Sequence, residues 1–174
     1  MRRLLLLRHA KTETNAPSGR DVDRRLDDNG RRDASLMGSW LQRHPPLPDL
    51  VCVSPATRAR QTWDLVAAEL GTPPTVEHVD ELYGAGPAEL LAVIHGAAVQ
   101  DPRQLMVVGH NPGLHELALG LVGSGDDDAR KAIAGNLPTA GIVVIDFAID
   151  DWGDAGLRRG ELKQFVSPKL LKSE

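Results

Sequence analysis

Short apolar runs alternate along the chain with longer stretches in which apolar residues recur every three or four positions. The apolar runs predict buried strands at 4–7, 50–53, 75–79, 105–108, 142–149 and 160–166. The stretches with helical spacing predict helices at about 28–44, 55–70, 87–98 and 113–121. Strands that alternate with helices indicate an α/β, three-layer α/β/α fold with a mostly parallel sheet. The final pair of strands, joined by a turn, adds an antiparallel C-terminal edge strand to this expectation.

Polar residues indicate where the helices begin and which segments are loops. Asp27 or Asp28 is expected to cap the first helix, because an aspartate side chain accepts hydrogen bonds from the first amides. Asn111 is expected to cap the helix that follows the run at 105–108. The segment 16–26 is expected to be a polar loop. The three aspartates at 126–128 are expected to be a solvated loop as well.

Composition narrows the class of protein. A chain of 174 residues with 41% hydrophobic and 25% charged residues suits one globular domain over 1–174. The net charge of −4 gives no indication of a nucleic-acid or membrane partner. The single cysteine, Cys52, cannot form an internal disulfide, and no apolar run is long enough to span a bilayer. We therefore expect a cytoplasmic protein.

Arginine and histidine residues, the candidates for catalysis, follow directly after three of the predicted strands. Arg8 and His9 follow the first strand, Arg58 follows the second within one helical turn, and His110 follows the run at 105–108. Because the carboxyl ends of parallel strands meet at one edge of a sheet, these groups are expected to converge. Guanidinium groups bind anionic oxygens in a fork, and an imidazole attacks phosphorus or transfers a proton. The pattern predicts a site for a phosphate dianion.

These motifs, taken together and in this order, resemble the histidine phosphatase (phosphoglycerate-mutase-like) superfamily. The motifs that carry the resemblance are Arg8-His9, Asn15, Ser54-Pro55-Ala56-Thr57-Arg58 and Val108-Gly109-His110-Asn111-Pro112. Ala10-Lys11 departs from the Gly-Glu that commonly follows Arg-His in the family. With the short chain and Leu137-Pro138-Thr139-Ala140, this variant is similar to the SixA-like branch of phosphohistidine phosphatases. It makes a sugar-phosphate mutase a weaker alternative.

The resemblance implies a role for each of four central residues. His9 is the implied nucleophile, which becomes a phosphohistidine that water then hydrolyses. Arg8 and Arg58 are implied to hold the equatorial phosphate oxygens, and burial beside them should keep His9 unprotonated. His110 is implied to donate a hydrogen bond to the phosphoryl group.

The resemblance also implies an acid and three binding residues. It places a carboxylate that protonates the leaving group after the third strand, where Glu81 fits best and Asp80 is the competitor. Asn15 is implied to contact the phosphate, and Lys11 and Thr139 to line the substrate pocket. No metal and no organic cofactor is implied.

The sequence therefore predicts a cofactor-independent phosphatase that acts through a covalent intermediate on His9. Its expected partner is a phosphorylated protein, carrying phosphohistidine, or a small phosphorylated molecule. Two alternatives remain open: a non-catalytic phosphate-binding or interaction module of the same fold, and a phosphoglycerate-type mutase. Formation of a phosphoenzyme separates the enzyme from the binding module, and dependence on an added bisphosphate identifies the mutase.

Overall fold

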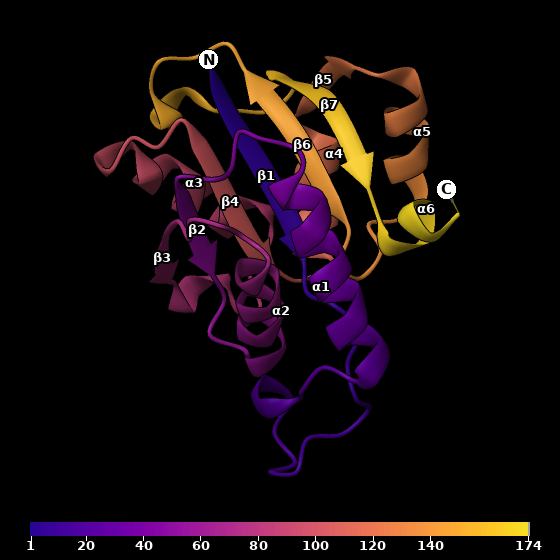
Figure 1. Cartoon of the computed structure of the whole chain (residues 1–174). Coiled ribbons are helices and arrows are strands. Elements are labelled where there is room, and N and C mark those ends of the chain that lie inside the picture. The colour runs from indigo at the N-terminus through magenta and orange to yellow at the C-terminus, as the bar shows by residue number, and fades with distance from the viewer. Residues whose placement is uncertain (174) are drawn as a thin grey trace.

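A seven-stranded sheet with the order β3-β2-β4-β1-β6-β7-β5 forms the centre of the computed structural model, which describes residues 1–173 (Figure 1). Its strands are β1 (Arg2–Arg8), β2 (Leu50–Val53), β3 (Thr75–His78), β4 (Gln104–Gly109), β5 (Val122–Gly125), β6 (Ile142–Phe147) and β7 (Gly160–Val166). The strand β1 lies in the middle of the sheet, and its four leucines are buried on both faces. This burial explains why β1 is continuously apolar rather than alternating.

The direction of the strands confirms the α/β class. The strands β1, β2, β3 and β4 run parallel, and β6 is antiparallel to both of its neighbours, β1 and β7. The antiparallel strand therefore lies inside the sheet and not at its edge. The expected edge position was wrong because β5, the glycine-rich segment Val122–Gly125, pairs in parallel with β7 and extends the sheet further.

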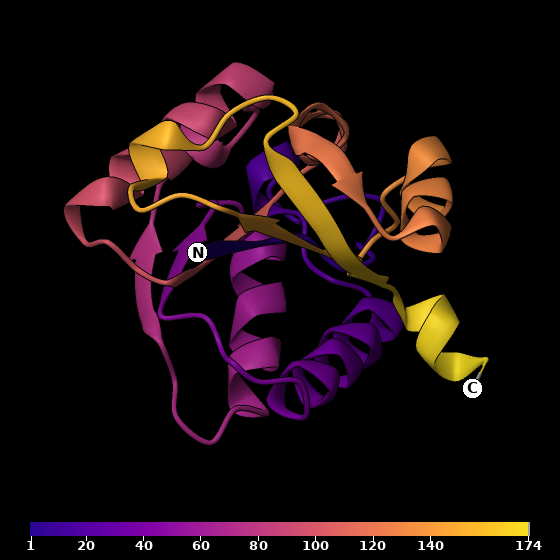
Figure 2. The same ribbon diagram turned by 90° about the horizontal axis from the view of Figure 1, so that it is seen from above.

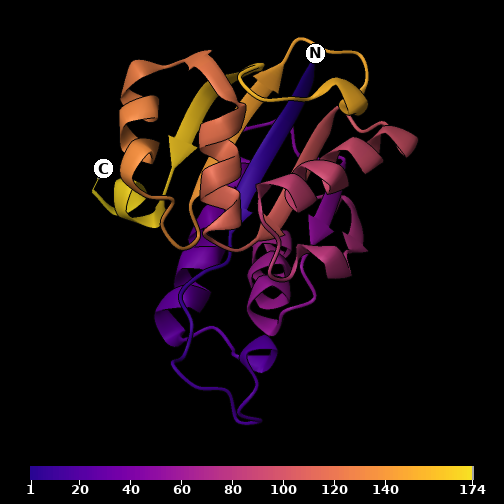
Figure 3. The same ribbon diagram turned by 180° about the vertical axis from the view of Figure 1, so that it is seen from behind.

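Helices cover both faces of the sheet. They are α1 (Asp28–Gln42), α2 (Thr57–Ala68), α3 (Pro87–Gly96), α4 (Gly113–Leu121), α5 (Asp127–Gly135) and α6 (Pro168–Lys172). Short 3-10 helices are η1 (Asp21–Asp23), η2 (Asp80–Leu82), η3 (Ala97–Val99) and η4 (Trp152–Asp154). The helices α1 and α2 cover one face and α3, α4 and α5 the other, which gives three layers (Figures 2 and 3). Two apolar cores result, one containing Trp63 of α2 and the other Ile94 of α3. Along residues 1–173, no helix is long and apolar enough to cross a membrane.

The helix caps confirm one expectation and correct two. Asp27 caps α1, since its carboxylate accepts a hydrogen bond from the Gly30 amide at 2.7 Å. Asp126 caps α5 in the same way, so the three aspartates begin a helix instead of forming a loop. Asn111 caps no helix, because its amide donates to the carbonyl of Leu137 at 2.8 Å.

The register of the strands brings the predicted motifs to one edge. Leu7 and Val53 each pair with Val108, and Leu7 also pairs with Ile142. The residues that follow Leu7, Val53 and Val108 and those that precede Ile142 therefore leave the sheet side by side. Beyond this edge, the chain between β1 and α1 forms a long excursion (Figure 1). The isolated bridge between Thr12 and Leu26 closes the base of this excursion, which we call the 12–26 loop.

Candidate active site

His9 lies just past β1 in a buried position that defines its tautomer. Its side chain is 7% exposed, and its Nδ1 lies 2.8 Å from the carbonyl oxygen of Ala10. A carbonyl can only accept a hydrogen bond, so Nδ1 carries the proton and Nε2 keeps its lone pair. Burial, together with the charges of Arg58 and Arg8, lowers the pKa of His9 to about 4. The ring is therefore a neutral base at neutral pH, as expected for a nucleophile.

The first turns of α2 fix the backbone beside His9. The hydroxyl of Thr62, which is fully buried, accepts a hydrogen bond from the Ala10 amide at 2.9 Å. The same hydroxyl donates to the carbonyl of Arg58 at 2.7 Å. One side chain thus connects the nucleophile's loop to the helix that carries the second arginine.

The ring of His110 lies close to that of His9, with 5.3 Å between the ring centroids. Its Nε2 is 2.7 Å from the hydroxyl oxygen of Ser54, a fully buried residue. Its Nδ1 is buried and has no hydrogen-bond partner within residues 1–173. Burial first, then repulsion from a protonated His9 and from the charge of Arg58, together lower the pKa of His110 to about 3. His110 is therefore also neutral and has one ring nitrogen left to bind a ligand.

Arg8 and Arg58 are each held by their terminal nitrogens. Arg8 donates through Nη1 to the carbonyl of Leu137 at 3.0 Å. Arg58 donates through Nη1 to the carbonyl of Asp21 at 2.8 Å and through Nη2 to the Asp21 carboxylate at 3.0 Å. The Nε atom of each arginine is buried without a partner in the described chain. Both guanidinium groups are fixed in orientation while an N–H donor is still available.

Unpaired buried polar atoms concentrate at this place. Within residues 1–173 there are four of them: Nε of Arg8, Nε of Arg58, Nδ1 of His110 and Oδ1 of Asn111. An unpaired buried donor costs about 1–3 kcal/mol, so proteins rarely tolerate three such nitrogens in one site. The three nitrogens belong to residues that lie with His9 at this edge. Such a set of hydrogen-bonding groups suits a tetrahedral oxyanion bound next to His9 Nε2.

The 12–26 loop reaches this site, which the sequence did not indicate. Asp21 contacts Arg58, and its carboxylate accepts a hydrogen bond from the Tyr83 hydroxyl at 2.7 Å and from Arg24 Nε at 3.0 Å. The ring of Tyr83 meets that of His110 edge-on at 5.8 Å. The hydrogen bond from Tyr83, together with those from Arg24 and Arg58, lowers the pKa of Asp21 to about 2. No local motif links residues 37 positions apart, so sequence reasoning missed Asp21, Arg24 and Tyr83.

Three other predicted residues lie on the surface. Glu81 is exposed in η2, two positions before Tyr83, and Asn15 and Lys11 are exposed in the segment after β1. Their side chains make no hydrogen bond or ion pair with another described residue. Their roles as proton donor and substrate contacts remain predictions.

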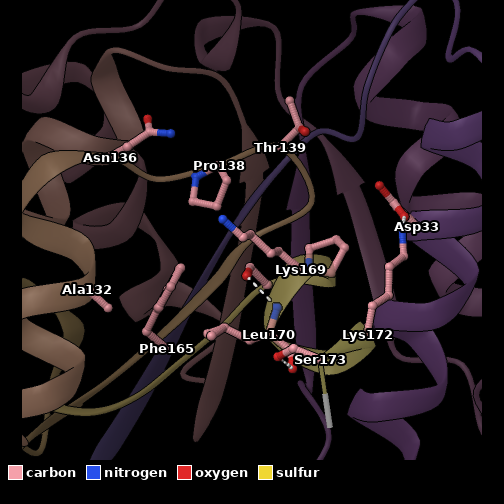
Figure 4. A pocket seen from close by; sticks show the side chains of 12 residues that line it. Asp33, Ala132, Asn136, Pro138, Thr139, Phe165, Lys169, Leu170, Lys172 and Ser173 are labelled. Carbon is pink, nitrogen blue, oxygen red and sulfur yellow. Dashed lines mark hydrogen bonds and ion pairs between the residues drawn. The ribbon is translucent and has the colours of Figure 1, made fainter.

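Thr139 lines a neighbouring groove of about 810 Å³ that also includes residues of α5, β7 and α6. In Figure 4, Thr139 and Pro138 lie at one end of this groove, and Lys169 and Lys172 project from α6. The loop of Thr139 also supplies the Leu137 carbonyl that holds Arg8. The groove and the candidate active site therefore share one loop. Nowhere in residues 1–173 do three or more His, Cys, Asp or Glu residues group to hold a metal ion.

The site thus brings two histidines and two arginines together at the carboxyl edge of an α/β sheet. The family model of the histidine phosphatase superfamily (branch 1) matches residues 4–83. The chain belongs to this superfamily, because a named phosphohistidine phosphatase, described below, is 30% identical to it and is covered over 67% of its own length. A similar protein over nearly the whole chain is the uncharacterized protein ML1117 of Mycobacterium leprae, which is 35% identical over 169 residues, covering 94% of this chain and 100% of that protein.

Several of the similar proteins that carry a name are SixA phosphohistidine phosphatases. Phosphohistidine phosphatase SixA of Escherichia coli K12 is 30% identical over 110 residues, covering 63% of this chain and 67% of that protein. A solved structure from Nakamurella multipartitia, assigned to the SixA phosphohistidine phosphatases, is 32% identical with a TM-score of 0.81 and covers 96% of both chains. A SixA structure complexed with tungstate has a TM-score of 0.75 at 24% identity, covers 97% of this chain and 99% of that one, and shows the shared fold. The chain is thus a SixA-like member of the superfamily.

Proposed function

We propose that this protein is a phosphatase that transfers a phosphoryl group to His9 and then to water. The lone pair of His9 Nε2 attacks phosphorus, the bond to the leaving group breaks, and the leaving group takes up a proton. Water then attacks the phosphohistidine, which releases inorganic phosphate and returns His9 to its neutral form. Glu81 is our candidate for the group that supplies the proton to the leaving group.

One observation carries this proposal: the three residues that lie with His9 at this edge, Arg8, Arg58 and His110, each keep one buried nitrogen without a partner, while Nε2 of His9 is unprotonated. When the Ser54 hydroxyl donates to Nε2 of His110, the proton of that ring sits on Nδ1 and is available to a phosphoryl oxygen. The Nε groups of Arg8 and Arg58 supply two further donors. Donors fixed before the reaction stabilise the charge that develops on the phosphoryl oxygens without a reorganisation cost.

We propose further that the phosphoryl group comes from a phosphohistidine on another protein. The similarity to the Escherichia coli phosphohistidine phosphatase supports this substrate class. A small phosphomonoester is the alternative within the same chemistry. A phosphorylated imidazole leaves readily once it is protonated, which suits a site whose proposed acid is exposed.

The test compares a phosphohistidine peptide with p-nitrophenyl phosphate, in EDTA, for the wild type, His9→Ala and the control His44→Ala. His44 is exposed just past the end of α1 and lines a hollow with Arg3 at the start of β1, the end of the strand opposite the site residues. We expect the wild type and the control to cleave the peptide much faster than the ester, and His9→Ala to be inactive. Rapid quenching with ³²P-labelled substrate should trap an acid-labile phosphoenzyme in the first two proteins only.

Other outcomes would change the conclusion in a defined way. If only p-nitrophenyl phosphate is hydrolysed, the phosphatase activity is supported and the phosphohistidine protein is excluded as substrate. Binding of phosphate with no trapped phosphoenzyme and no turnover would indicate a binding module. Activity that depends on an added bisphosphate would indicate a mutase.

A further inference from the structure

Both phosphate-binding arginines are oriented by other groups, but the group that holds Arg58 is unusual. Arg8 is held by the carbonyl of Leu137, a buried residue of the fold. Arg58 is 6% exposed, yet both of its terminal nitrogens are bound by Asp21, whose side chain is 55% exposed. A surface residue on a loop therefore determines where a buried guanidinium points.

Asp21 is itself fixed from several directions. The Tyr83 hydroxyl donates to the carboxylate oxygen that binds Arg58, and Arg24 donates to the other oxygen. Arg24 is anchored in turn by the hydroxyl of Thr12 at 2.7 Å. The carboxylate is thus held in one position even though solvent reaches it.

The 12–26 loop also has fixed ends. The Glu13 amide donates to the Arg25 carbonyl at 2.9 Å, and the Leu26 amide donates to Gln61 Oε1 of α2 at 2.9 Å. Leu26 is fully buried. The loop is therefore attached to α2, the helix whose first turn carries Arg58. Because both ends of the loop are fixed by hydrogen bonds, Asp21 is held next to that turn.

We propose that Asp21 is a positioning residue that holds Arg58 with its Nε directed at the phosphoryl group. This inference rests on the phosphatase function proposed above. Asp21 binds only the two Nη atoms, so Nε and one further N–H on each Nη remain for the substrate oxygens. Without the carboxylate, Nη2 loses its partner and the guanidinium is free to turn toward water. If Asp21 instead competed with phosphate for Arg58, replacing Asp21 would strengthen the binding of phosphate or orthovanadate rather than weaken it.

The test compares Asp21→Ala with Asp23→Ala, a matched control from the same 3-10 helix. The Asp23 carboxylate accepts from the Ser18 hydroxyl at 2.7 Å and makes no hydrogen bond to Arg58. Two quantities are measured: orthovanadate affinity by calorimetry, and the mobility of the Arg58 Nε–H group by ¹⁵N NMR. We expect Asp21→Ala to weaken orthovanadate binding about fivefold or more and to mobilise Arg58. Asp21→Asn should recover part of the affinity, and Asp23→Ala should resemble the wild type.

A double-mutant cycle distinguishes positioning from a general effect on the loop. If Asp21 acts through Arg58, Asp21→Ala should change orthovanadate affinity by less than about twofold once Arg58→Ala is present. Tighter binding by Asp21→Ala, an unchanged Arg58 signal, or an equal effect in both backgrounds would overturn the proposal. Failure of the phosphatase function is a separate result, in which the wild type binds no orthovanadate and hydrolyses neither substrate.

Discussion

Protonation of His9 should weaken the folded state in a defined pH window. Its pKa is about 4 in the folded protein, compared with 6.5 for an unperturbed histidine. This difference corresponds to roughly 3 kcal/mol against charging the buried ring. The unfolded chain takes up the proton below pH 6.5, whereas the folded chain does so only near pH 4. The contribution of His9 to stability is therefore complete above pH 6.5 and is lost as the pH falls toward 4.

The assay is urea unfolding of the wild type and His9→Asn between pH 4 and 7.5. An asparagine side chain can still donate to the Ala10 carbonyl but does not titrate, so it removes the proton uptake and keeps the local hydrogen bond. We expect the wild type to lose roughly 3 kcal/mol more than the variant over this range. NMR of the ring nitrogens should show the Nδ1–H form of His9 down to about pH 5. A parallel loss of stability in both proteins, or a ring titration near pH 6.5, would refute this reasoning.

Three further predictions concern single side chains. Arg8→Lys should slow phosphoenzyme formation by about a hundredfold in rapid-quench experiments, because a point charge replaces an oriented donor; a loss below about threefold would contradict this role. Ser54→Ala should lower kcat/KM about tenfold and the free energy of unfolding by about 1–3 kcal/mol, since His110 Nε2 loses its partner; recovery by Ser54→Thr is the check. Gly30→Ala should lower the free energy of unfolding by about 1–3 kcal/mol in urea, because the added methyl group would clash with the backbone carbonyl of Lys11. The control Gly96→Ala in α3 has open space for the methyl group and should be neutral or stabilising by up to about 1 kcal/mol. Equal effects of the two substitutions would contradict the packing argument.

The sequence predicted the parts of the structure that depend on apolar runs and on strand direction. The run at Leu4–Leu7 and its counterparts in β2 and β4 correspond to observed strands. Since parallel strands share an edge, the convergence of His9, Arg58 and His110 followed from their positions after these strands. Burial of His9 between charged neighbours was predictable for the same reason.

The features that the sequence did not predict depend on contacts between distant segments. The strand β5 contains two glycines and a serine, so its place beside β7 is determined by pairing and not by an apolar pattern. Asn111 was expected to cap a helix, but the nearby carbonyl of Leu137 binds its amide instead. The contact between Asp21 and Arg58 joins an exposed loop to a helix. Such a contact produces no pattern of apolar residues from which it could be predicted.

The central position of β1 has a consequence for how the chain folds during synthesis. In the described sheet, β1 pairs with β4 and β6, which begin much later in the chain, at Gln104 and Ile142. At ordinary rates of translation, its four leucines wait roughly 5–20 s for the first of these partners. During that interval, the segment that carries the nucleophile is an apolar strand with two open edges, the kind of segment that chaperones cover and that aggregates when it is left alone. Substitutions at Leu4–Leu7 should therefore lower the folding yield as well as the final stability.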